Sequence, residues 1–322
     1  MAKQSDNVPC RLYAILAREA PTAVIFRRGP SRRVQVIKWD TATDTFTPGQ
    51  WFHGRIYERR CDLSPDGKLM IYFAQKINRR TMDDKEYTYA WTAISQPPYL
   101  TALALWPKGD CWDGGGLFTA NHQVWLNHPP GRTKPHKAHR PQGLTVSHNE
   151  GPLGEDDPIF HRRLERDGWR HIQEWQGEFI QSAMQNAFQD RMREGKPTDL
   201  DWMLSLGDLG TDSRYVTHAP GIHEKPHIIQ PLTLVMTTAL IGFQHQHRYA
   251  IRDAAGNEKE LTEAEWADWD QQGRLVFTQA GKILASAADA IGEGAPQELA
   301  DLNGNKPEPI KSPDWTKVWP KQ

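Results

Sequence analysis

Short apolar segments separated by turn residues recur along most of the chain, and this rhythm limits the folds that it can adopt. Residues 11–18, 22–27 and 34–39 are early examples, rich in aliphatic and aromatic side chains and divided by polar, Pro or Gly residues. Such segments follow one another about every 8–12 residues, with few helical patterns between them. The sequence therefore predicts an all-β fold, which could be a sandwich, a barrel or a propeller.

One phrase of a turn followed by a strand occurs twice. Residues 63–73 read LSPDGKLMIYF, and residues 269–277 read WDQQGRLVF. In both copies a large apolar residue stands four positions before a glycine, and a basic residue, Leu and an apolar strand follow. Gly67 and Gly273 are expected to take the positive φ that other residues avoid, so that the next strand begins at once.

The SPDG phrase and its strand resemble the repeat of WD40-like and TolB-like β-propellers, and residues 266–277 look like a second, degenerate copy. The resemblance covers these two segments directly and the other blades only by the spacing of strands. It implies an all-β, β-propeller-like fold of about five blades with a minor helical insertion, the alternative being a β-sandwich or barrel. The likeness is to bacterial propeller-like proteins and supplies no site residues.

The chain is expected to have four parts. Residues 1–127 would form N-terminal blades, and residues 128–157, rich in Pro, Gly and His, would form an exposed loop. Residues 158–301 would form C-terminal blades, interrupted by a helix over residues 179–194 that has one apolar stripe. Residues 302–322 are typical of a tail.

Three hairpins are predicted within the C-terminal blades, each at a turn that contains glycine. The first covers residues 162–174, where Asp167-Gly168 lies between two short segments that mix polar and apolar residues, 162–166 and 169–174. The other two cover residues 248–262 and residues 269–285.

Composition excludes several classes of protein. The first nine residues lack the apolar segment of a secretory signal, and the longest apolar-rich run, residues 231–243, is too short to cross a bilayer. Cys10, Cys61 and Cys111 are odd in number and far apart, which is typical of reduced thiols and predicts a cytoplasmic protein. The 39 Lys and Arg residues nearly balance the 40 Asp and Glu residues, which argues against attraction of the whole molecule to nucleic acid or membrane.

Catalytic and cofactor-binding signatures are missing from the sequence, so we expect a non-catalytic protein that needs no cofactor. The alternative is a propeller hydrolase, in which one of several carboxylates at strand ends acts as the acid. Its candidate residues are Asp62, Asp268 and Asp270. A metal-dependent version would use His223, His245 and His247, because alternate residues of a strand point to the same face.

Binding to another macromolecule is the function that we expect. Interfaces favour Trp and Arg, and the chain has thirteen Trp residues. The predicted function is a protein-binding scaffold or accessory subunit of a larger bacterial assembly, acting through one face and the long loop. A further alternative is single-stranded nucleic-acid binding, with arginines on phosphates and Trp on bases. The candidate binding residues are Arg27, Arg28, Arg32, Arg33, Trp51 and Trp112.

Overall fold

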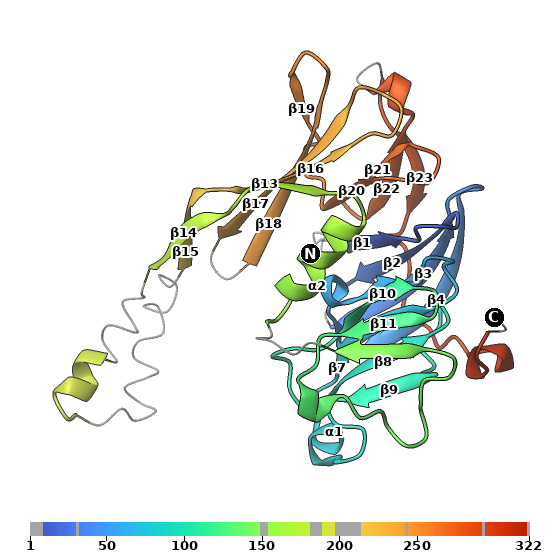
Figure 1. The fold of residues 1–322 in the computed structure, drawn as a ribbon, viewed down its shortest axis with the longest axis vertical. Helices are drawn as coiled ribbons and strands as arrows, with labels where there is room; N and C mark the ends of the chain where they lie inside the picture. The colour runs from blue at the N-terminus through green and yellow to red at the C-terminus, as the bar shows by residue number, and fades with distance from the viewer. Residues whose placement is uncertain are drawn as a thin grey trace, which may run out of the picture. The chain divides into compact units, whose positions relative to one another are not determined.

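The computed structural model describes residues 9–29, 32–148, 154–180, 189–196, 214–241, 244–291 and 294–320. It divides into two compact units (Figure 1). Unit 1 comprises Met1–Gly168, His227–Gln230 and Glu263–Gln322, and unit 2 comprises Trp169–Pro226 and Pro231–Thr262. The described strands form five small sheets of three to five strands and one two-stranded ribbon, which confirms the predicted all-β, β-propeller-like fold of about five blades.

Unit 1 contains four of the sheets, and nearly all of their strand pairs are antiparallel. Sheet 1 has the order β1-β2-β3-β4, and sheet 2 has the order β5-β7-β8-β9 with β6 beside β7. Sheet 3 has the order β10-β11-β12, and sheet 5 has the order β20-β21-β22-β23. The bounds are β1 (Arg11–Leu16), β2 (Thr22–Arg28), β3 (Arg33–Asp40), β4 (Thr45–His53), β5 (Arg55–Ile56), β6 (Asp62–Leu63), β7 (Met70–Gln75), β8 (Ala90–Ser95), β9 (Ala104–Pro107), β10 (Gly116–Ala120), β11 (Gln123–Leu126), β12 (Thr145–His148), β20 (Trp266–Trp269), β21 (Leu275–Gln279), β22 (Lys282–Ser286) and β23 (Gln297–Asp301).

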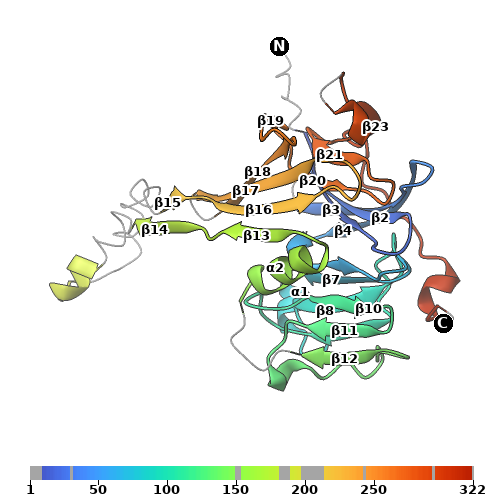
Figure 2. The same cartoon turned by 45° about the horizontal axis from the view of Figure 1, so that its top comes forward.

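Two α-helices and several short 3-10 turns complete unit 1. Helix α2 lies against η1 and β10 (Figure 2). None of the described helices has the length and apolar character needed to cross a membrane. The bounds are α1 (Arg79–Asp83), α2 (Asp157–Arg166), η1 (Glu58–Arg60), η2 (Pro130–Arg132), η4 (Ala288–Ala290) and η5 (Asp314–Lys317).

The four sheets of unit 1 pack face to face in the order sheet 5, sheet 1, sheet 2, sheet 3. Sheets 1 and 2 are therefore covered on both faces, which explains why β2, β7 and β8 are almost continuously buried instead of alternating between buried and exposed residues. Buried residues from both partners fill each contact: Trp39 and Val276 between sheets 5 and 1, Phe26 and Met70 between sheets 1 and 2, and Trp106 and Phe118 between sheets 2 and 3.

The two glycine turns occupy equivalent places in their sheets. Gly67 has φ +70° between β6 and β7, and Gly273 has φ +76° between β20 and β21. Each glycine N–H donates to the backbone carbonyl three residues earlier, at 2.8 and 2.9 Å. The loops differ by one residue, because Leu63 pairs with Met70 whereas Trp269 pairs with Leu275. The repeat is thus confirmed at the turn and shifted by one position in the strand after it.

The predicted hairpin over residues 162–174 is wrong in its first half, which belongs to helix α2. Ile159, Phe160 and Leu164 form a buried stripe at helical spacing. Gly168 has φ +90°, and its N–H donates to the Glu165 carbonyl at 3.1 Å, so the Asp-Gly pair ends a helix. The other two predicted hairpins are confirmed as β18–β19 and β21–β22.

Two further segments differ from expectation. Phe179 and Ile180 lie in strand β14, so the predicted helix does not begin there; residues 189–193 are helical, and residues 181–188 lie outside the described residues. The segment 128–157 is only partly an exposed loop. It contains η2 and β12, which pairs in parallel with β11, and its first side chain, His128, is fully buried.

Unit 2 contains one sheet and one ribbon. Sheet 4 has the order β13-β16-β17-β18-β19, and β14 pairs with β15 in the ribbon. All of these pairs are antiparallel. The bounds are β13 (Arg170–Gln173), β14 (Gln176–Ile180), β15 (Arg214–Ala219), β16 (Gly221–Pro226), β17 (Thr233–Ile241), β18 (Gln244–Arg252) and β19 (Glu258–Glu260).

The predicted tail is fixed to the sheets of unit 1, and we call residues 302–319 the C-terminal strap. The Arg27 Nε donates to the Leu302 carbonyl at 2.9 Å. Gln50 of β4 donates to the Ile310 carbonyl at 2.9 Å, and Gln96, just after β8, donates to the Val318 carbonyl at 2.8 Å. The strap therefore connects sheets 1 and 2 through its own backbone.

Replacing Gly67 by alanine should weaken folding, because the new Cβ would have to accept a positive φ and lie 2.8 Å from the Thr22 Cβ. We expect Gly67→Ala to lower the free energy of unfolding by about 1–2 kcal/mol in urea titrations. Gly131→Ala is the control, because nothing lies within 4 Å of its Cβ position. Equal effects of the two changes would contradict this account of the turn.

Candidate functional site

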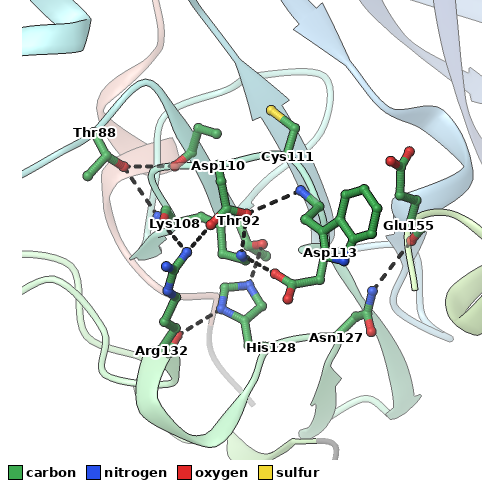
Figure 3. Close-up of polar contacts among 12 residues, drawn as sticks. Thr88, Thr92, Lys108, Asp110, Cys111, Asp113, Asn127, His128, Arg132 and Glu155 are labelled. Atoms are coloured by element: carbon green, nitrogen blue, oxygen red, sulfur yellow. Dashed lines mark hydrogen bonds and ion pairs between the residues drawn. The ribbon is translucent and has the colours of Figure 1, made fainter. Parts of the chain in front are cut away.

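A cluster of polar side chains lies where the loops leave sheets 2 and 3 of unit 1 (Figure 3). Its members come from four places in the chain: β8, the loop after β9, the end of β11, and η2. We call it the bracing cluster, and its residues are Thr92, Lys108, Asp110, Asp113, His128 and Arg132.

Lys108 is the centre of the bracing cluster. Its side chain is only 1% exposed, and its Nζ lies 2.6 Å from Asp110 and in contact with Asp113. Burial lowers the pKa of Lys108, and the hydrogen bond with Asp110 opposes that shift. Arg132 pairs with the same Asp110 and donates to the Lys108 carbonyl at 3.0 Å. The positive charges of Lys108 and Arg132 are thus balanced by the two carboxylates, Asp110 and Asp113.

His128 links two further parts of the cluster. Its Nδ1 lies 2.8 Å from the Arg132 carbonyl and its Nε2 lies 2.8 Å from the Thr92 hydroxyl. A carbonyl only accepts, so we assign the proton to Nδ1, and Thr92 then donates to Nε2 while accepting from the Gly115 N–H at 2.8 Å. Burial lowers the pKa of His128 to about 4, so the ring is neutral near pH 7.

Arg60 holds the same loop from the other side. This fully buried side chain donates to the backbone carbonyls of Cys111 at 2.7 Å and Asp113 at 3.2 Å. Its other nitrogens pair with Asp156 at 2.5 Å and Glu155 at 3.0 Å, just before α2. The backbone on both sides of residue 112 is therefore fixed by one guanidinium group.

Trp112 lies on the loop that these contacts hold in place, and it is exposed to solvent. Its side chain is 70% exposed, while its backbone N–H donates to Asp110 at 3.1 Å. The neighbouring Cys111 is no nucleophile candidate, because burial raises the pKa of its thiol. The arrangement suits binding, because an exposed indole lies on a loop whose backbone is held by contacts of the buried Arg60 and Lys108 side chains.

The predicted basic turn does not form one surface. Arg27 is 3% exposed, and besides Leu302 it donates to the Asn303 carbonyl at 3.1 Å. Its guanidinium also lies 5.2 Å from the centre of the Trp51 ring. Arg28 pairs with Glu58 at 2.7 Å, and the side chains of Arg32 and Arg33 are exposed. Arg27 and Trp51 thus serve the packing of sheet 1 and the strap.

The three carboxylates predicted as catalytic candidates do not form one cluster, and each has a hydrogen-bond or ion-pair partner. Asp62 is fully buried, pairs with both terminal nitrogens of Arg166 at 2.5 and 2.9 Å, and accepts from the Phe118 N–H at 2.8 Å. Asp270 lies in the turn after β20 and pairs with Arg274 at 2.8 Å. Asp268 accepts from the Trp269 N–H at 2.8 Å. The structure therefore does not bring Asp62 together with the other two.

The predicted histidines lie in unit 2, on two strands that are not neighbours. His223 is on β16, His245 and His247 are on β18, and β17 pairs with both strands between them. Two inter-strand spacings, about 10 Å, separate β16 from β18. Across the residues that the structure describes, no group of three His, Cys, Asp or Glu could hold a metal ion.

Sequence reasoning identified Trp112 but missed the bracing cluster around it. Lys108 carries a signal in hindsight, since it is a single cation between the buried strand Ala104–Pro107 and a glycine-rich turn. Its partners His128 and Arg132 come from a distant loop, and nothing local in the sequence indicates that pairing. No protein-family model matches this chain, and no curated protein matches it at a significant level.

Asp62→Asn should destabilise the protein strongly, because it removes the fully buried carboxylate that Arg166 pairs with and leaves that guanidinium only the less buried Asp167. We expect a loss of about 3–5 kcal/mol of unfolding free energy, measured by denaturant titration. Asp314→Asn, at a side chain that is 95% exposed, is the matched control. If Asp62→Asn is as stable as wild type, the Asp62 carboxylate does not contribute to the stability of the fold.

The buried His128 should make stability depend on pH. Its pKa is about 4 in the folded chain against the ordinary 6.5 of an exposed histidine. Between these values the unfolded chain binds more protons, so stability falls as pH falls. Wild type should lose about 3 kcal/mol more than His128→Gln when unfolding is measured from pH 7 down to pH 4. His122→Gln, at an exposed histidine, is the control. Parallel profiles of wild type and His128→Gln would contradict a buried neutral ring.

Proposed function

We propose that this chain is a non-catalytic protein-binding scaffold, or an accessory subunit of a larger assembly, that grips its partner through the loop bearing Trp112. The observation that carries the proposal is that a 70% exposed indole stands on a backbone held by Arg60 and Asp110. Tryptophan is the residue most enriched where partners contribute most binding energy. A loop already fixed in place loses little entropy on binding.

The long loop that begins at His128 supports the same proposal. His128 and Arg132 belong to the bracing cluster, so this loop and the Trp112 loop are parts of one connected surface. Lys134, Lys137 and Arg140 follow and have exposed side chains. Loops on a rigid β frame are where recognition residues gather in proteins.

We further propose that the sheets are blades of the WD40-like or TolB-like kind, and that the protein acts in the bacterial cytoplasm. The equivalent turns at Gly67 and Gly273 support the first part. Three unpaired cysteines, two of them buried, support a reducing compartment. These proposals concern the type of blade and the compartment, and the binding proposal does not depend on them.

The test compares partner capture by full-length tagged variants in the cell of origin, quantified by mass spectrometry. Trp112→Ala should reduce recovery of the specific partner by about tenfold or more while leaving the melting temperature unchanged. Trp315→Ala is the matched control, because that indole is also exposed, at 53%, but lies on the strap. Equal recovery with Trp112→Ala and wild type would refute the proposed surface.

A further inference from the structure

Three loops meet at one end of unit 1, and together they form what we call the loop face: residues 76–89, 108–113 and 127–140. The Lys108 N–H donates to the Thr88 hydroxyl at 3.2 Å, which joins the first two loops. The Tyr87 ring stacks on His136 with 4.2 Å between centres, and Glu86 pairs with Lys137 at 2.8 Å, which joins the first and third. In Figure 1 this end of the unit is marked by α1, beside β8 and β9.

Positive charge is concentrated on the loop face. Residues 114–149 contain no Asp or Glu, although the whole chain has a net charge of only −1. Six cations of this face form no salt bridge with a carboxylate of the described residues, although Arg80 lies close enough to Asp84 to help lower the pKa of that carboxyl. They are Lys76, Arg79, Arg80, Lys85, Lys134 and Arg140.

The few carboxylates of the loop face are largely occupied. Glu86 is taken by Lys137 and His136, and Asp84 accepts from two backbone N–H groups of its own turn. Asp110 and Asp113 are neutralised inside the bracing cluster by Lys108 and Arg132. Asp83 is exposed and offsets one of the positive charges. The surface potential of the loop face is therefore set mainly by the cations that form no salt bridge.

Apolar side chains stand among these cations. Ile77 is 59% exposed and Met82 is 49% exposed, both on the segment that carries Arg79 and Arg80. Together with Trp112 they give the loop face a mixed character of aliphatic, aromatic and cationic groups. Protein interfaces have this composition, with apolar anchors and a charged rim.

We infer that the partner bound at the loop face is a protein whose contact surface is acidic around an apolar pocket. This inference rests on the proposed function and names the chemistry of the partner at the same surface. Carboxylates would meet the six cations, and the pocket would receive Trp112. Such charge complementarity speeds association and rejects partners of the same sign.

Nucleic acid and lipid fit the same surface less well. A phosphate backbone offers nothing to Ile77 or Met82, and one face of the Tyr87 ring is already covered by His136, which leaves less surface for stacking a base. An anionic bilayer would attract the same cations, but its headgroup surface has no fixed pocket to orient Trp112 beside them. An acidic protein surface accommodates the apolar and the cationic groups together.

The test uses the full chain and three defined probes in fluorescence anisotropy. The first is a fluorescein-labelled peptide of about ten glutamates with a central leucine, the second an oligo-dT of equal charge, and the third a phosphatidylserine–phosphatidylcholine vesicle. We expect the peptide to bind best at low salt and to weaken as salt screens the charges. Tighter binding of oligo-dT or of the vesicle would overturn the inference.

Arg79→Glu/Arg80→Glu is the informative variant, because both side chains are exposed on α1 and acidic residues are favourable in the first turn of a helix. It should weaken peptide binding by about tenfold. Lys306→Glu/Lys311→Glu makes the same change of charge on the strap, away from the loop face, and should bind like wild type. Equal behaviour of the two double variants would overturn the inference.

Failure of the inference and failure of the proposed function can be told apart with the partner-capture assay. If Trp112→Ala abolishes capture and Arg79→Glu/Arg80→Glu leaves it intact, the loop face binds a protein but not through its charge, and only the inference fails. If capture survives Trp112→Ala, the proposed function fails as well. Loss with both variants supports the two together.

Discussion

Buried arginine side chains hold the irregular segments of unit 1 against its sheets. Arg60 fixes the loop around Trp112, Arg166 joins α2 to Asp62, and Arg27 binds the strap. In each case the guanidinium donates to carbonyls or carboxylates that would otherwise lie buried without a partner, which would cost free energy. Arginine suits this role, because it stays charged and offers five donors in a planar fork.

The burial of such groups is favourable only when their donors are used. Arg60 meets this condition: all three of its nitrogens have partners, and the flat group lies 4.7 Å from the Tyr57 ring centre and 5.3 Å from that of Phe73. Removing one partner would leave a buried charge uncompensated, which is more costly than never having built the pair. The packed sheets therefore form the rigid core of unit 1, and the arginine contacts fix the positions of the loops on that core.

This division explains how much could be predicted from the sequence. The strands, the glycine turns at Gly67 and Gly273 and the β-propeller-like class follow from local patterns, and they are confirmed. The hairpin at Asp167-Gly168 was wrong, because the same dipeptide can end a helix, and only the buried stripe on α2 decides between the two. The bracing of Trp112 could not be predicted, since Arg60, Lys108 and His128 meet through tertiary contacts that leave no local pattern.

The strap has a consequence for the order in which the protein assembles. The hydrogen bond between Arg27 and Leu302 joins residues 275 positions apart. Gln50 in β4 and Gln96 just after β8 must already be in place to bind the rest of the segment. Closing a loop of this length costs conformational entropy, and that cost is offset only when the sheets that bind the strap have formed. We therefore expect the strap to dock after sheets 1 and 2 have formed, and Leu302, which packs in the core between sheets 1 and 5, to stay exposed until then.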